Sequence, residues 1–442
     1  MKIDTSLQGN TVAVCPTPTF IDLFAGCGGF SLGLQSAGFV CKWAVEMDAD
    51  ASETYRTNIG NHIVCADVRR IKANTVPEVD VVVGGFPCQP FSISGLQNGF
   101  QDKDGDLFLE CVRFIRSIRP KALILENVPG FARLQNGIYL KEALRILAAE
   151  EYVTDWRVLN AADYGVAQTR ERLFIIGNTL GRQNEFPTPD GKRISVLDAI
   201  DDIRHDMAAF SNNEPMRHTE RIKRRFAAVA AGESAVHAMK RDPSLGTAKI
   251  TKQCYRRLFA DQPAPTVVAN FVTTTIHYCE DRNLTAREAA RLQSFPDSFV
   301  FCGRKTRMSW QTGLSQFEQI GNAVPPRLAE ALGRSLLKVL AGATPRAQSA
   351  LSDQELFQMP ISVDSSRRSE CKNSGKRGRK SRYGAIYAQI EAAPLGSPFC
   401  LPSELPEEFF VFLEGAMRRR RIAFHVDRPF GRPAVLTKTG GV

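Results

Sequence analysis

The chain has 442 residues, of which 43% are apolar and 24% are charged, and its formal net charge is +10. These values are typical of a globular protein with two or three domains, and the excess of Lys and Arg favours a polyanionic partner. The 11 cysteines include no Cys-x-x-Cys spacing and the six histidines are unclustered, which argues against a metal site or a disulfide framework. Without a signal peptide or a bilayer-length apolar run, we expect a cytoplasmic protein with no membrane partner.

The first regular pattern in the sequence is a strand, a glycine-rich turn and a helix. Residues 19–24 form a short apolar strand, residues 25–29 form the turn, and residues 30–37 have helical spacing. Such a unit presents backbone N–H groups at the start of the helix, where a nucleotide-like or carboxylate-bearing ligand can bind. The spacing differs from Gly-x-Gly-x-x-Gly, which lowers the expectation of a dinucleotide and leaves the ligand open.

Acidic residues end the next two predicted strands. Residues 40–45 are followed by Glu46, and the strand near residues 62–65 is followed by Asp67. An acid at the end of the second strand can accept hydrogen bonds from ribose hydroxyls, and Asp67 is a candidate partner for an adenine amino group. The alternative for each is a solvated acid at the start of a helix.

One cysteine has an unusual sequence context. Residues 79–83 are a β-branched run typical of a buried parallel strand, and Gly-Gly-Phe-Pro-Cys-Gln-Pro-Phe-Ser follows at residues 84–92. The glycines allow a close approach of the backbone, and the prolines fix the backbone on both sides of Cys88. Open α/β sheets bind ligands at this edge, so Cys88 is a candidate nucleophile; the alternative is a small buried filler. Residues 92–105 are predicted to form a mobile loop.

The same sheet edge is predicted to carry a glutamate, and two arginines enter a later strand, where such residues usually form a solvated rim. A helix at residues 107–118 and a strand at residues 122–125 precede Glu126, whose burial beside Cys88 would favour the protonated carboxyl. A helix (140–150), a strand (153–159), the segment Gln-Thr-Arg-Glu-Arg at 168–172 and a last strand (173–176) follow. This alternation predicts an α/β fold with a doubly wound, mostly parallel sheet.

Read in order, these motifs resemble those of the DNA (cytosine-5)-methyltransferases of bacteria and phages. Six segments between residues 19 and 340 are similar to the family's motifs: Pro-Cys-Gln-Pro-Phe-Ser at 87–92, Glu-Asn-Val at 126–128, Gln-x-Arg-x-Arg at 168–172, Pro-Thr-Val at 265–267, and the closing motifs at 284–296 and 319–326. The resemblance implies a Rossmann-like fold, S-adenosylmethionine as methyl donor and double-stranded DNA as the substrate.

The resemblance also implies a cofactor-binding set. Its members follow the ends of the predicted strands or belong to the last motif: Phe24, Gly26, Gly28, Glu46, Met47, Asp67, Pro87, Leu107 and Asn322. Met47 stands where many relatives have an aromatic ring against the adenine.

The chemistry implied by the resemblance is covalent. The Cys88 thiolate would add to C6 of cytosine while Glu126 holds a proton at N3, and Arg172 would donate to the base with Arg170 nearby. Because none of this can occur inside a stacked duplex, the target base would be flipped out into the site. DNA contacts are expected from Gln89, Ser92 and Thr266, and no metal is expected to take part.

The sequence predicts five segments. They are a catalytic domain at 17–180, an inserted smaller target-recognition domain at 181–283, closing motifs of the catalytic domain at 284–343, a basic linker at 344–382 and a small α+β appendage at 383–442. From residue 345 onward, 16 Lys and Arg stand against 10 Asp and Glu. Two predicted helices and a hairpin near residues 422–436 suggest a winged-helix-like module that binds nucleic acid, and the alternative is a solvated tail.

Two rival functions remain at this point. A tRNA-methylating relative would use the same chemistry, but the basic insert at 181–283 favours the reading of duplex DNA. A non-catalytic DNA-binding regulator would not need Cys88, Glu126 and Arg172 together. We expect a monomer in the bacterial cytoplasm, associated with the nucleoid. The target sequence and the existence of a cognate restriction endonuclease stay open, because base contacts depend on loop geometry.

Overall fold

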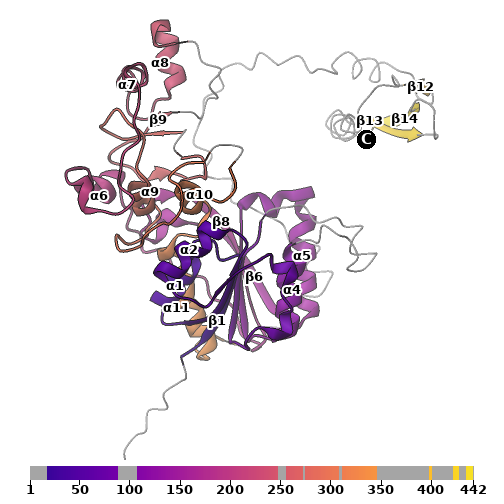
Figure 1. Ribbon diagram of the computed structural model, residues 1–442. Coiled ribbons are helices and arrows are strands. Elements are labelled where there is room, and N and C mark those ends of the chain that lie inside the picture. Colours follow the sequence, from indigo (N-terminus) through magenta and orange to yellow (C-terminus); the bar gives the residue numbers. More distant parts are fainter. Residues whose placement is uncertain are drawn as a thin grey trace, which may run out of the picture. The chain divides into compact units, whose positions relative to one another are not determined.

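The computed structural model describes residues 17–87, 107–246, 255–271, 274–307 and 311–345, together with three strands between residues 398 and 441 (Figure 1). The chain divides into one unit over residues 1–363 and a second over residues 364–442. Cys88, Gln89, Ser92 and the predicted loop at 92–105 lie outside the described residues. Within the described ranges, no helix combines the length and the apolar character needed to cross a membrane.

A seven-stranded sheet forms the centre of the first unit, in the order β3-β2-β1-β4-β5-β8-β6. Its strands are β1 (Thr19–Leu23), β2 (Val40–Glu46), β3 (Ile63–Cys65), β4 (Val81–Gly85), β5 (Ala122–Asn127), β6 (Val153–Asn160) and β8 (Glu171–Asn178). All neighbours pair in parallel except β8, which is antiparallel to both β5 and β6. The predicted doubly wound, mostly parallel sheet is confirmed, and the order reverses between β1 and β4.

Helices cover both faces of this sheet (Figure 1). One face carries α1 (Gly29–Ser36), α2 (Ala49–Asn58) and α11 (Pro326–Leu340), and the other carries α4 (Leu107–Ile118) and α5 (Ile138–Ala149). Each face has its own apolar core. The late helix α11 packs so closely on α1 that a Cβ added at Gly33 would lie 2.3 Å from the Pro326 carbonyl oxygen. Only a glycine at this position allows the approach. Residues more than 290 positions apart therefore complete one layer.

The segment between β8 and α9, which we call the inserted region (residues 181–283), is built from short elements. They are α6 (Val196–Ile200), α7 (Glu220–Ala227), α8 (Ala235–Arg241), β9 (Arg256–Arg257), β10 (Ala264–Pro265) and β11 (Thr275–Ile276). β10 pairs with β7 (Gln168–Thr169), beside the sheet, and β11 pairs with β9. Two further apolar clusters lie here and in the segment that follows.

Two short helices follow the inserted region, and single 3₁₀ turns join many elements. Thr285 and Glu288 form the predicted capping box at the start of α9 (Ala286–Leu292), and α10 covers Gln316–Asn322. The 3₁₀ turns are η1 (Val68–Arg70), η2 (Ala73–Thr75), η3 (Pro129–Gly137), η4 (Ala161–Tyr164), η5 (Asp202–Arg204), η6 (Met207–Ala209) and η7 (Pro243–Leu245).

The second unit contains an antiparallel sheet in the order β12-β14-β13. Its strands are β12 (Pro398–Cys400), β13 (Ile422–Asp427) and β14 (Val435–Gly441). β13 and β14 pair along their lengths, which confirms the predicted hairpin. The two helices predicted within residues 383–421 lie outside the described residues.

Candidate active site

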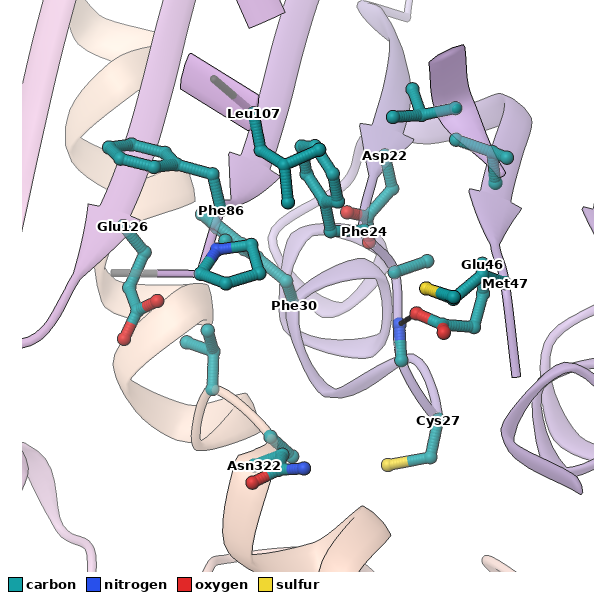
Figure 2. A pocket seen from close by; sticks show the side chains of 18 of the residues that line it. Asp22, Phe24, Cys27, Phe30, Glu46, Met47, Phe86, Leu107, Glu126 and Asn322 are labelled. Carbon is teal, nitrogen blue, oxygen red and sulfur yellow. Dashed lines mark hydrogen bonds between the residues drawn. The ribbon is translucent and has the colours of Figure 1, made fainter. Parts of the chain in front are cut away.

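A cavity of about 920 Å³ opens at the carboxyl ends of β1, β2, β4 and β5, at the point where the strand order reverses. Open α/β sheets bind ligands at such a point, because the loops of neighbouring strands diverge there. Figure 2 shows Glu46 and Met47 on one side of this cavity and Glu126 on the other. Nearly all the predicted cofactor and catalytic residues among the described ones line it: Phe24, Gly26, Glu46, Met47, Asp67, Pro87, Leu107, Glu126, Arg170, Arg172 and Asn322. Gly28 and Thr266 do not line it.

The turn from β1 to α1 brings backbone N–H groups to the cavity. Phe24, Gly26 and Gly28 all have positive φ angles, of 62°, 55° and 99°. At Gly28 any side chain would collide with Ile59 at 2.1 Å, so only glycine allows α2 to pack here. Gly28 therefore shapes the turn from behind the wall of the cavity, whereas Gly26 faces the cavity directly.

The carboxylate of Glu46 fixes the glycine turn to the end of β2. Its Oε2 accepts a hydrogen bond from the Gly26 N–H at 2.9 Å, and its Oε1 accepts one from the Asp48 N–H at 2.8 Å. Burial raises the pKa of Glu46 above its usual value, although these backbone donors act in the opposite direction. Each oxygen keeps a second lone pair, so the carboxylate can still accept a ligand hydroxyl.

Asp67 is held by a neighbouring arginine. The Arg69 side chain donates to both carboxylate oxygens, with Nη2–Oδ2 at 2.7 Å, and these hydrogen bonds lower the pKa of Asp67. The side chain of Met47 is 72% exposed beside it. Met47 and Asp67 therefore offer a pliable thioether and an ionised carboxylate at this side of the cavity.

The other side of the cavity holds an ion pair. Arg172 Nε lies 3.1 Å from Glu126 Oε1, and both side chains are nearly buried. Burial raises the pKa of Glu126, and the positive charges of Arg172 and Arg170 oppose this shift. The next residue, Asn127, donates from Nδ2 to the Phe86 carbonyl at 3.1 Å, which fixes the chain just before Pro87. Glu126 is therefore held beside the segment that leads into Cys88.

Arg170 is buried, and its guanidinium binds backbone rather than solvent. Nη1 donates to the Val267 carbonyl at 2.8 Å, and Nη2 donates to the Gly321 and Ala323 carbonyls at 2.9 and 3.0 Å. Burial lowers the pKa of Arg170 to about 9. This one side chain joins β7, the inserted region and the turn that carries Asn322. Thr266, next to Val267, is half-buried, and its hydroxyl donates to the Thr169 carbonyl at 2.8 Å.

Sequence reasoning missed several residues of the cavity wall, among them Asp22 and Leu314. Asp22 is 1% exposed, accepts a 2.6 Å hydrogen bond from Ser31 Oγ, and has its pKa raised to about 7 by burial. An acid inside an apolar strand was the available signal. Leu314 lies between the two closing motifs, in a polar stretch (303–318) that the sequence does not assign to any motif, and its N–H donates to Asp48 Oδ2 at 2.9 Å. No local pattern marks Leu314.

The part of the chain that builds the sheet, the inserted region and the cavity resembles known proteins. The sequence profile of the family described as C-5 cytosine-specific DNA methylase matches residues 18–338. The chain belongs to this family. It is therefore a DNA cytosine methyltransferase, and its methyl donor is S-adenosylmethionine.

Among the relatives of this methyltransferase are enzymes named as Type II methyltransferases. M.DdeI of Desulfomicrobium norvegicum is 37% identical over 72% of this chain and 88% of its own length. M.NgoFVII of Neisseria gonorrhoeae is 32% identical over 73% of this chain and 87% of its own length.

Two solved structures are similar to this methyltransferase. A prophage-encoded protein of E. coli superimposes with a TM-score of 0.58 at 26% identity, over 73% of this chain and 99% of its own. The methyltransferase EhMeth of Entamoeba histolytica has a TM-score of 0.51 at 14% identity, over 74% of this chain and 99% of its own, which shows the fold alone.

Proposed function

We propose that this methyltransferase acts on a cytosine flipped out of duplex DNA, through a covalent bond between Cys88 and C6 of the base. The observation that carries the proposal is the single cavity shared by the Glu46 side and the Glu126–Arg172 pair, with Pro87 lining it. Pro87, the residue directly before Cys88, therefore lies in the cavity wall. A base stacked in a duplex cannot enter such a cavity, so the target must leave the helix.

The residues divide the chemistry between them. C5 of cytosine is a poor nucleophile, and addition of the Cys88 thiolate to C6 makes C5 electron-rich. Glu126, whose pKa is raised by burial, holds the proton at N3 that this addition requires. After methyl transfer, loss of the C5 proton and departure of the Cys88 thiolate restore the aromatic ring. Arg172 orients Glu126 through their ion pair and donates to the base edge.

The cavity suits S-adenosylmethionine on chemical grounds. When bound, this cofactor supplies an electrophilic methyl group on a positively charged sulfonium. The nearby carboxyl groups of Asp22 and Glu46 favour a cation, and Phe24, Met47 and Leu107 offer apolar contact to an adenine. We propose that Glu46 binds the ribose hydroxyls, that Asp67 binds the adenine edge, and that Asn322 closes the methionine end. In this proposal Arg170 is a positioning residue, because both of its Nη groups donate to backbone carbonyl groups.

We also propose that the inserted region reads the DNA sequence, with 17–180 and 284–343 forming the catalytic domain. Support comes from the packing of the inserted region against the catalytic domain. Its strand β10 pairs with β7, and Thr266, which follows β10, donates to the Thr169 carbonyl. Gln89 and Ser92 are proposed to contact the flipped base and its backbone.

The linker at 344–382 and the appendage at 383–442 are proposed to be accessory segments that the methyl transfer itself does not need. The Type II names of the relatives support a cognate restriction endonuclease, and we propose a cytoplasmic monomer.

The decisive experiment traps the covalent bond. Duplexes carrying 5-fluorocytosine at the target should form an adduct with the wild-type protein and cofactor, because fluorine cannot leave as a proton does. Cys88→Ala should form no adduct and transfer no methyl group, whereas the matched variant Cys65→Ala, at an exposed cysteine, should behave as wild type. Adduct formation by Cys88→Ala, or its absence in the wild type, refutes the mechanism.

A second experiment tests the recognition role. Replacing residues 181–283 with the equivalent segment of M.DdeI should give the chimera the target sequence of M.DdeI. A folded, active chimera that keeps the original target sequence contradicts the assignment. Assays on tRNA in parallel separate the DNA enzyme from an RNA-methylating one.

A further inference from the structure

The outer part of the inserted region, residues 217–246, is a small basic lobe. It contains seven Lys and Arg against three Asp and Glu. Its helices α7 and α8 and the turn η7 enclose an apolar core of their own, which includes Phe226, Met239 and Leu245. Because this core fixes the helices relative to one another, the charges on the lobe are held in defined positions.

Each acid of the lobe has a partner. Glu220 pairs with Lys223 at 2.9 Å, and Glu233 pairs with Arg241. Asp242 accepts a hydrogen bond from the Ser244 N–H at 2.9 Å, and the Ser244 hydrogen bonds, with Arg224 nearby, lower the pKa of this exposed carboxyl. The acids are therefore engaged away from the remaining arginines.

Two of those arginines converge on one glycine. Arg221 and Arg225 are four residues apart on α7, so they share a face of the helix. A Cβ added at Gly246 would lie 2.9 Å from Arg225 Nη2 and 3.1 Å from Arg221 Nη2. The two nitrogens are therefore no more than about 6 Å apart, by the sum of these distances. Within the part of the chain that the structure describes, no carboxylate lies within 4.0 Å of either guanidinium.

The close approach of Arg221 and Arg225 is electrostatically unfavourable. Like charges spaced four residues apart destabilise a helix. Arg225 is nevertheless fixed, because its Nε and Nη2 both donate to the Leu245 carbonyl, at 3.2 and 3.1 Å. Gly246 has a φ of +116°, which favours glycine, and because it lacks a side chain the two guanidiniums can both approach its backbone. An anion bound there would relieve the repulsion.

We propose that Arg221, Arg225 and Gly246 form a phosphate-binding cradle that grips the DNA backbone outside the recognised sequence. Guanidinium groups bind phosphate oxygens through paired N–H donors, and two guanidiniums this close to each other can bind the same phosphate. None of the three residues lines the catalytic cavity. Because a contact to a phosphate carries no base information, the cradle contributes affinity rather than base reading. The inference rests on the proposed recognition role of the inserted region.

The test measures binding of the full chain to target and non-target duplexes across a salt series. Arg221→Gln removes one phosphate contact, so the slope of log K against log salt should fall by about 0.9, and affinity at 0.1 M salt should fall about eightfold on both duplexes. The matched variant Lys223→Gln removes the same charge from the same helix and should keep the wild-type slope. An unchanged slope in Arg221→Gln, or an equal fall in Lys223→Gln, overturns the cradle.

A steric variant separates shape from charge. Gly246→Ala keeps every charge, but the added Cβ would meet both guanidiniums and displace them, so DNA affinity should fall several-fold. Gly38→Ala is the control for backbone strain, because Gly38 has a φ of +100° with no atom within 4 Å of an added Cβ. Equal affinities for these two variants contradict the proposal. If the cradle variants bind as wild type while adducts form and the segment exchange transfers specificity, the cradle alone fails and the proposed function stands.

Discussion

The sheet domain and the inserted region keep charged groups out of water for different reasons. In the sheet domain, β4 and β5 bury continuous apolar runs such as Leu123, Ile124 and Leu125, and the buried charges gather at the cavity, where Glu126 and Arg172 pair. In the inserted region the strands are only two residues long, and a buried arginine, Arg257, donates to four backbone carbonyls and to Asp281. In our proposal the buried pair of Glu126 and Arg172 serves chemistry, whereas the buried Arg257 serves architecture.

The largest expected effect tests the chemical half of this contrast. Glu126→Gln keeps the shape of the side chain but cannot supply a proton, so methyl transfer should fall about 1,000-fold, which corresponds to about 4 kcal/mol. The free energy of unfolding should not fall by more than about 1 kcal/mol, because the buried carboxyl is itself held at a cost. Methyl-transfer rates and denaturant unfolding measure the two quantities. A loss of stability that parallels the loss of rate would make Glu126 architectural.

The architectural half is tested at two adjacent arginines. Arg257→Met leaves four carbonyls without their donor, and the free energy of unfolding of the unit should fall by about 3–4 kcal/mol. Arg256→Met is the matched control, because Arg256 is exposed and, among the residues that the structure describes, its side chain donates to the Gly232 carbonyl alone. It should cost less than about 1 kcal/mol in denaturant unfolding. If both variants lose the same free energy of unfolding, the buried hydrogen bonds of Arg257 are not what stabilises the inserted region.

The apolar core of the sheet gives the next effect. Leu123 is fully buried in β5, so Leu123→Ala should lower the free energy of unfolding by about 3 kcal/mol through lost burial and a new cavity. Leu197→Ala, at a leucine that is 43% exposed in the inserted region, should change it by less than about 1 kcal/mol. If Leu197→Ala lowers the free energy of unfolding more than Leu123→Ala does, the two regions do not differ in how much apolar packing stabilises them.

The smallest effect concerns pH and a buried histidine of the inserted region. Burial, reinforced by the charge of Arg282, lowers the pKa of His277 to about 3, whereas an unfolded histidine titrates near 6.5. The unfolded chain therefore binds more protons between these values, and stability is lost as pH falls below about 6.5. Between pH 6.5 and 5.5 the loss from this group should be about 1 kcal/mol. His277→Gln should remove that part of the pH slope, and His205→Gln, at an exposed site, should not.

Local sequence determined much of the sheet domain. The β-branched run before Gly84 and Gly85 and the apolar strand before Glu126 specify buried parallel strands, because burial on both faces requires continuous apolar residues. The strand ends then bring Glu46, Asp67 and Glu126 to one edge. The direction of β8 had no such signal, since an apolar run buries equally well in either direction.

Only the tertiary structure decided which arginines are structural and what completes the cavity. Arg170 binds the carbonyls of Val267, Gly321 and Ala323, which lie 97 to 153 residues away. Leu314 reaches the cavity because its N–H donates to Asp48, 266 residues earlier. Every residue carries a backbone carbonyl and nearly every one an N–H, so a partner of this kind leaves no signature in the sequence. Side-chain patterns specified the sheet, and backbone partners that only folding brings together specified the rest.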